Sequence, residues 1–90
     1  MAQALVDPGE LRRFAQHLKQ FNQELRDRLA ALHGHVLALS DTWRDQEHEK
    51  FAHDFEQTMR AVQAFLAQSD QYIPFLQRKA ERVEAYLGQH

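Results

Sequence analysis

The 90-residue chain has no cysteine, two prolines and three glycines, and each shortage excludes some structure or chemistry. Without cysteine there is no disulfide, thiolate metal site or cysteine nucleophile, and the redox state of the compartment stays open. With few helix breakers, long helices are expected. No apolar run approaches the roughly 20 residues that span a bilayer, and residues 1–10 lack the basic and apolar regions of a cleavable signal peptide.

Patterns that carry catalysis or hold a cofactor are also missing. No glycine-rich phosphate loop occurs, and Ser40 and Ser69 have no recognisable nucleophile context. The chain has six histidines but no Glu-x-x-His pair of the kind used by metal-binding bundles, so we expect most histidines to be solvated. Ser69 is expected to bond back to the carbonyl of Phe65, or to make room for a bulky neighbour. We therefore expect no enzyme activity, no metal and no cofactor.

The charges are interspersed and sum to −2, and no basic block precedes the helical repeat, which argues against nucleic acid as the main partner.

In the first half of the chain, Asp7, Pro8 and Glu10 have the residue types of a helix start. A seven-residue leucine repeat follows, which predicts a seam against another helix: Leu11, Leu18, Leu25, Leu32 and Leu39. Phe14 and Phe21 lie beside this seam, and the flanking apolar role then passes to Leu29 and Val36. We predict a helix over residues 8–40, with Gly34 inside it, and a turn near residues 41–44.

The second half of the chain predicts a helix over residues 45–87, with Gly88 placed to cap it. It carries two seven-residue series, Phe55, Val62, Ser69, Leu76, Val83 and Met59, Leu66, Ile73, Ala80, Leu87. A third row consists of Phe51, Phe65, Tyr72 and Tyr86. Three adjacent apolar rows form a stripe wider than one helix partner can cover. Pro74 either kinks this helix or starts a third one, and the unbroken repeat favours the kink.

The segment around Trp43, the only tryptophan, is the most specific local pattern in the sequence. Trp43 falls in the expected turn between two long heptad helices, Phe51 follows eight residues later, and Phe55 comes after it. In a chain close to 100 residues long, this arrangement resembles the WXG family, the small early-secreted-antigen-like substrates of type VII secretion. The sequence signature covers residues 43–55, and the architectural resemblance covers nearly the whole chain.

The sequence departs from the family pattern in two places. The third position of the Trp-X-Gly motif is Asp45, which a turn can accept if it needs no positive φ there. Many substrates of the actinobacterial branch also carry a tyrosine followed four residues later by Asp or Glu. Here Tyr72 is followed at that distance by Leu76, and Tyr86 by His90.

The resemblance implies an all-α, antiparallel helical hairpin that fills residues 1–90 as a single domain and pairs into a four-helix bundle as a dimer. Its partner is a second copy or a similar hairpin. The implied function is that of a non-enzymatic type VII secretion substrate or secretion partner, secreted without a cleavable signal peptide. The alternative is a cytoplasmic coiled-coil scaffold or adaptor that is not exported, and the missing export signature separates the two.

The resemblance also implies which residues form the turn motif and which of them contacts a partner. The turn motif consists of Trp43, Asp45 and Phe51. In an antiparallel dimer, Trp43 comes within reach of Tyr86 or Leu87 of the partner subunit. The seven-residue apolar repeats, in turn, give the residues expected in the core or the interface: Leu11, Leu18, Leu25, Leu32, Leu39, Phe55, Val62, Leu66, Ile73, Leu76 and Val83.

Overall fold

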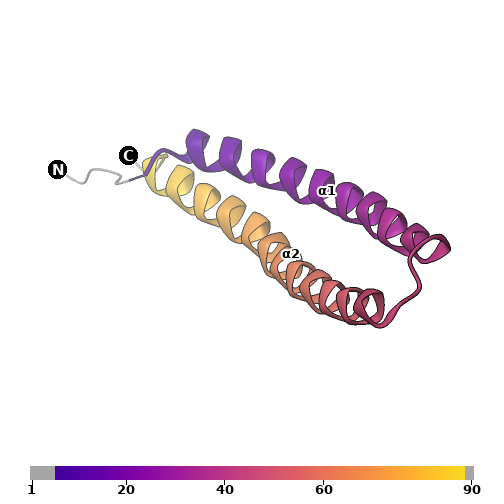
Figure 1. Cartoon of the computed structure of the whole chain (residues 1–90). Coiled ribbons are helices and arrows are strands. Elements are labelled where there is room, and N and C mark those ends of the chain that lie inside the picture. Colours follow the sequence, from indigo (N-terminus) through magenta and orange to yellow (C-terminus); the bar gives the residue numbers. More distant parts are fainter. Residues whose placement is uncertain (1–5, 89–90) are drawn as a thin grey trace.

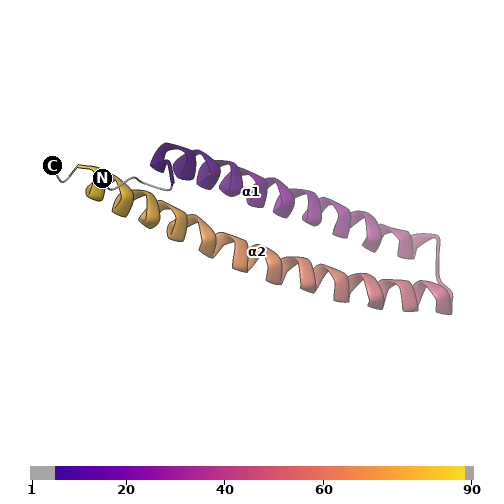
Figure 2. The same ribbon diagram turned by 90° about the vertical axis from the view of Figure 1, so that its left-hand side faces the viewer.

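The computed structural model describes residues 6–88, which form two long antiparallel helices (Figure 1). Helix α1 spans Pro8–Ala38, the short 3-10 helix η1 spans Leu39–Asp41, and α2 spans Gln46–Leu87. No strand occurs in this range, so the predicted all-α hairpin is confirmed. The turn lies at one end of the hairpin, and the start of α1 and the end of α2 lie at the other, as a second view also shows (Figure 2). Predictions that involve residues 1–5 and His90 lie outside the described residues.

Helix α1 begins and ends through local contacts. As predicted, Asp7 is the N-cap, and its carboxylate accepts a 2.8 Å hydrogen bond from the Gly9 N–H. The helix continues through Gly34 and ends at Ala38, two residues before the predicted Ser40. η1 then tightens the chain, and the Trp43 N–H donates to the Leu39 carbonyl at 2.9 Å.

Helix α2 begins one residue after the predicted Asp45, because Asp45 is its N-cap. The Asp45 carboxylate accepts a 2.9 Å hydrogen bond from the His48 N–H. The helix runs through Pro74 without interruption to Leu87, so a third helix starting at Pro74 is wrong. Whether α2 is kinked at Pro74 stays a prediction.

The interior between the helices is thin, because two helices alone cannot enclose a core. Among residues 6–88 the buried apolar side chains are Ala15, Val36, Met59, Leu66 and Ala80. Most of the predicted seam is half-buried, namely Leu11, Leu18, Leu25, Phe55, Val62, Ile73, Leu76 and Val83. None of the helices in the described part is long and apolar enough to cross a membrane.

Two of the predicted seam leucines leave the interior. Leu32 and Leu39 are 46% and 40% exposed, and Val36 is buried in their stead. A straight α-helix with 3.6 residues per turn drifts about 20° per heptad relative to a strict seven-residue repeat. After three heptads the leucine row has therefore rotated toward the outside of the hairpin.

Candidate protein–protein interface

The exposed apolar side chains of the two helices gather on one side of the hairpin. Four of the large ones stand immediately before a position that faces the other helix: Phe14 before Ala15, Phe21 before Asn22, Phe65 before Leu66 and Tyr72 before Ile73. A step of one residue turns about 100° around a helix. In each helix, the residue before an inward position is therefore rotated away from the interior by the same angle and in the same direction along the chain. Because α1 and α2 run antiparallel, these rotations bring the exposed apolar residues of both helices to the same side of the hairpin.

We call this surface the apolar face, and define it by Phe14, Phe21, Leu32, Leu39, Phe65 and Tyr72. Its side chains are 40–54% exposed, with Phe14 the most exposed and Leu39 the least. Contiguous exposed apolar surface of this kind marks protein–protein interaction sites. The predicted third row of α2 is therefore present on the surface, where the hairpin mate leaves it uncovered.

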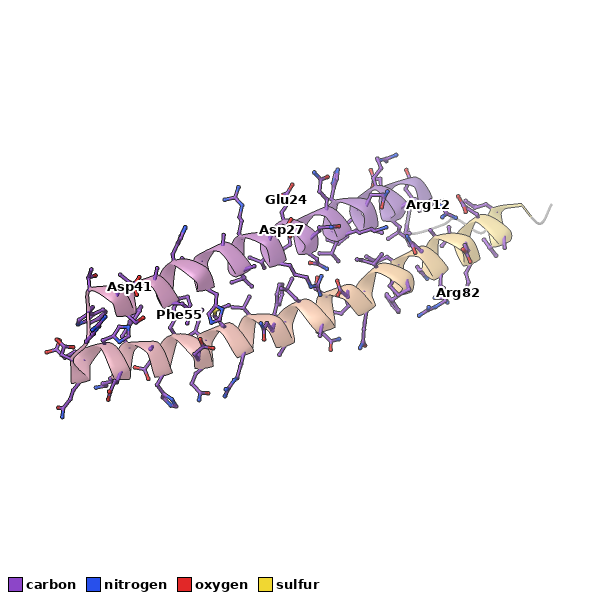
Figure 3. The ribbon with its side chains drawn as sticks, turned by 90° about the vertical axis from the view of Figure 1, so that its right-hand side faces the viewer. Arg12, Glu24, Asp27, Asp41, Phe55 and Arg82 are labelled. Atoms are coloured by element: carbon purple, nitrogen blue, oxygen red, sulfur yellow. The ribbon has the colours of Figure 1, made fainter. Side chains whose placement is uncertain are left out.

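The opposite side of the hairpin carries polar residues, most of which stand immediately after a position that faces the other helix. We call it the polar face, and its residues form three cross-helix pairs: Arg12 with Glu84, Arg26 with Asp70, and His33 with Glu56. Arg12 Nε lies 3.4 Å from Glu84 Oε2, and His33 Nε2 lies 2.7 Å from Glu56 Oε1. In Figure 3 Glu24 and Arg82 point away from the neighbouring helix, whereas Phe55 lies between the helices. The polar face thus joins α1 to α2 through two ion pairs and one histidine–carboxylate contact.

Two of these pairs change the proton affinity of their carboxylates. The hydrogen bond from Arg26 holds the pKa of Asp70 below its ordinary value, and a hydrogen bond from Asn22 adds to this effect. The hydrogen bond from Arg12 likewise lowers the pKa of Glu84. Both shifts arise because the guanidinium favours the charged carboxylate.

A buried polar contact lies between the two faces, near the middle of the hairpin. Asn22 and Ser69 are each only 1% exposed. The Ser69 hydroxyl donates to Asn22 Oδ1 at 2.8 Å, and Asn22 Nδ2 donates to Asp70 Oδ1 at 3.0 Å. The predicted bond from Ser69 to the Phe65 carbonyl is therefore wrong, because the Ser69 hydroxyl donates across the interior to Asn22 instead. Local sequence spacing gave no sign of this contact, which joins residues 47 positions apart.

The turn end carries a cluster of aromatic rings. Trp43 is half-buried and its ring meets His48 edge-on, with centroids 5.0 Å apart. The ring centroid of Phe51 lies 5.7 Å from that of Trp43 and 5.9 Å from that of Phe55. The three predicted turn residues thus meet here: Trp43 and Phe51 pack together, and Asp45 caps α2.

Asp45 replaces the family glycine without strain, because its φ is −113° and its side chain forms the N-cap of α2.

His48 and His33 were missed by the sequence analysis, which expected most histidines to be solvated. His48 is half-buried against Trp43, and its Nε2 is buried without a hydrogen-bond partner. The spacing of His48, three residues after a capping aspartate and five after the tryptophan, is the signal that could have found it. No group of three or more potential metal ligands occurs within residues 6–88.

Comparison with known proteins agrees with this architecture. Residues 3–86 match the WXG100 family, described as proteins of 100 residues with WXG. No curated protein sequence matches the chain.

Solved structures of EsxB, a secreted protein from Bacillus anthracis, are similar throughout. The wild-type structure has a TM-score of 0.77 and 27% sequence identity, over 91% of this chain and 94% of that one. A selenomethionine-labelled form has a TM-score of 0.78 and 26% identity, over 96% and 98%. A proline-to-alanine mutant has a TM-score of 0.79 and 28% identity, over 91% and 92%. The chain therefore belongs to the WXG100 family.

Proposed function

We propose that this protein pairs through its apolar face with a second helical hairpin, forming a four-helix bundle, and acts without enzymatic activity as a type VII secretion substrate or as the partner of one. The observation that carries the proposal is the apolar face, which spans both helices. EsxB, which shares the fold at 26–28% identity, is a secreted protein. We further propose that the chain leaves the cell without a cleavable signal peptide.

The amount of exposed surface supports pairing. The chain exposes 7190 Å², whereas a compact protein of its mass would expose about 5500 Å² by the usual size scaling. The excess, about 1700 Å², is of the size that each subunit buries in an obligate dimer. A second hairpin laid on the apolar face would supply the missing layer.

The charge distribution supports an antiparallel arrangement of two such hairpins. Residues 41–56, at the turn end, contain six acidic and two basic residues, a net charge of −4. Residues 8–20 and 71–88, at the terminal end, together contain six basic and three acidic residues, a net charge of +3. The hairpin is 70 Å long, so these ends are well separated. A second copy placed head to tail sets each acidic end beside a basic one.

In that arrangement Trp43 would lie near Tyr86 or Leu87 of the partner subunit. Trp suits such a place, because its large ring can be buried while its N–H still reaches water or a carbonyl. Fluorescence on dilution tests the placement. We expect the Trp43 emission to shift to the red as the dimer dissociates while helicity persists. An unchanged emission would show that Trp43 packs only within its own turn.

The proposed export is tested in the producing bacterium with an epitope-tagged chain. We expect the tagged protein in the culture medium of the parent strain, and only in the cells of a strain that lacks the type VII secretion ATPase. The Phe65→Asp variant, which places a charge on the apolar face, should stay in the cells at a normal level.

The competing function is a cytoplasmic scaffold or adaptor. It is favoured by the absence of the export signature, in which a tyrosine is followed four residues later by Asp or Glu. Here the residue four positions after Tyr72 is Leu76. Under that function the protein stays in the cells of both strains. Retention in the parent strain would therefore refute export and leave pairing to be judged by sedimentation.

A further inference from the structure

The hydrogen-bond ladder of α2 has a weak point at Pro74. Proline has no N–H, so the carbonyl of Asp70 one turn earlier loses its helix partner, and the proline ring crowds that same carbonyl. An interior proline costs a helix about 3 kcal/mol and usually kinks or breaks it. Nevertheless α2 is a single helix from Gln46 to Leu87. Contacts from outside α2 must therefore offset part of this cost.

The contacts that α1 supplies lie directly beside the break. Asp70, the residue whose carbonyl is left without a partner, receives hydrogen bonds on its side chain from Asn22 Nδ2 at 3.0 Å and from Arg26 Nη1 at 3.3 Å. Arg26 Nη2 also donates to Asp70 Oδ2, so the pair of guanidinium and carboxylate is bidentate. The neighbouring Ser69 donates to Asn22 Oδ1 at 2.8 Å. We call Asn22, Arg26, Ser69 and Asp70 the polar clamp.

The polar clamp has geometric properties that a chance surface pair lacks. Asn22 and Arg26 are one turn apart on α1, and they hold two consecutive residues of α2. Asn22 and Ser69 are each 1% exposed, so the hydrogen bond between them forms away from water, whereas the Arg26–Asp70 pair lies at the surface. Buried polar groups left without partners are costly, which makes this arrangement specific for one register of the two helices.

The packing differs on the two sides of the clamp. Toward the turn the interior holds the larger buried side chains Leu66, Met59 and Val36. Beyond Pro74, the fully buried residue of α2 is Ala80, a small side chain, at 0% exposure. Hollows of similar size adjoin the clamp on both sides. One of about 480 Å³ lies at the break and is lined by Lys19, Gln23, Arg26, Asp27, Asp70, Ile73, Pro74 and Gln77, and one of about 440 Å³ lies on the turn side and is lined by Arg26, Leu29, Ala30, His33, Met59, Gln63 and Leu66. The smaller buried side chain contributes less apolar burial, which lowers the free-energy cost of local opening beyond Pro74.

We propose that the polar clamp is a latch over a hinge at Pro74. While the latch is closed, residues 75–87, which we call the terminal arm, stay aligned with α1. When it opens, the arm swings about the turn of helix before Pro74, and the turn-side part of the hairpin stays packed. The pair of Arg12 with Glu84 is then the remaining polar contact that joins the arm to α1 within the described residues.

Hydrogen–deuterium exchange of the full chain tests the latch. In Asp70→Asn, and independently in Arg26→Gln on the other helix, we expect the amides of residues 75–87 to exchange about tenfold faster. The amides of residues 47–66 should stay within about twofold of the wild-type rates. The matched control is Glu56→Gln, which removes the carboxylate charge beside His33 on the turn side and should leave exchange in the arm unchanged.

A second substitution separates a latch over a hinge from a contact that merely stabilises the hairpin. Pro74→Ala restores the missing N–H, so in this background Asp70→Asn should accelerate exchange in the arm by less than about twofold. The proposal is overturned if neither clamp variant accelerates exchange in the arm, if exchange rises uniformly along α2, or if the acceleration persists at full size with Ala at position 74. All variants are compared at a concentration where sedimentation shows the same species.

Discussion

The two faces of the hairpin differ in whether their residues are matched within the chain. On the polar face, which follows the inward positions by one residue, each of the three described pairs joins α1 to α2. On the apolar face, which precedes the inward positions by one residue, Phe14, Phe21, Phe65 and Tyr72 are about half exposed. The two faces are therefore only two residues apart along each helix. The polar face holds the hairpin together, and the apolar face is left for a partner.

The largest expected effect comes from the interior that both faces share. Leu66 is 2% exposed, and Leu66→Asp would bury an unpaired charge at a cost of several kcal/mol. We expect loss of most helical circular dichroism at 25 °C. Leu37→Asp is the matched control, because Leu37 is 58% exposed and should keep the helicity of the wild type. A folded Leu66→Asp protein would show that the interior is not what holds the helices together.

The comparison of the faces predicts that charge on the apolar face affects association more than folding. Phe65→Asp is expected to raise the dissociation constant of the dimer about 30-fold or more, as loss of a central aromatic does in other interfaces. Helicity should be retained, and sedimentation velocity measures the change. Leu37→Asp again provides the control, because Leu37 is 58% exposed but stands immediately after the buried Val36, on the side opposite the apolar face. Equal weakening by both variants would mean that the apolar face is not the interface.

Acid should weaken the polar face. The pKa values of Asp70 and Glu84 are lowered by Arg26 and Arg12, so their stabilising contribution is present above the ordinary carboxyl pKa, near pH 4, and is lost as the pH falls through the lowered values. Asn22 also faces Asp70, and Lys19 and Asp27 line the same hollow. We expect the urea midpoint to fall between pH 5 and pH 2.5. The drop should be smaller in the double variant Asp70→Asn, Glu84→Gln, and an equal drop would assign the acid sensitivity to other groups.

The smallest expected effect lies at Gly34, outside both faces. A Cβ added there meets no atom within 4 Å, and the residue is inside α1. Gly34→Ala should therefore stabilise the hairpin by about 0.5–1 kcal/mol, because alanine loses less conformational freedom in a helix. Thermal unfolding should shift upward by a few degrees, with association unchanged. A lower midpoint would indicate that Gly34 is needed for a contact with the partner.

Sequence patterns predicted the helices and the turn because those features depend on local chemistry. Asp7 caps α1 and Asp45 caps α2, and both are recognisable from residue type and spacing. The outward rotation of Leu32 and Leu39 was not predicted, because a strict seven-residue count ignores the drift of a straight helix. The contact between Asn22 and Ser69 could not be predicted either, since it depends on how two distant segments align in register.

The narrow cross-section of the hairpin bears on how it could travel. Its Cα atoms extend 70 Å in length but only 17 by 14 Å across. With side chains included, two adjacent helices fit end-on through an opening of roughly 25 Å. A single hairpin that moved along its axis would therefore need no unfolding, and the caps at Asp7 and Asp45 would stay formed, whereas the proposed four-helix bundle would need a wider opening.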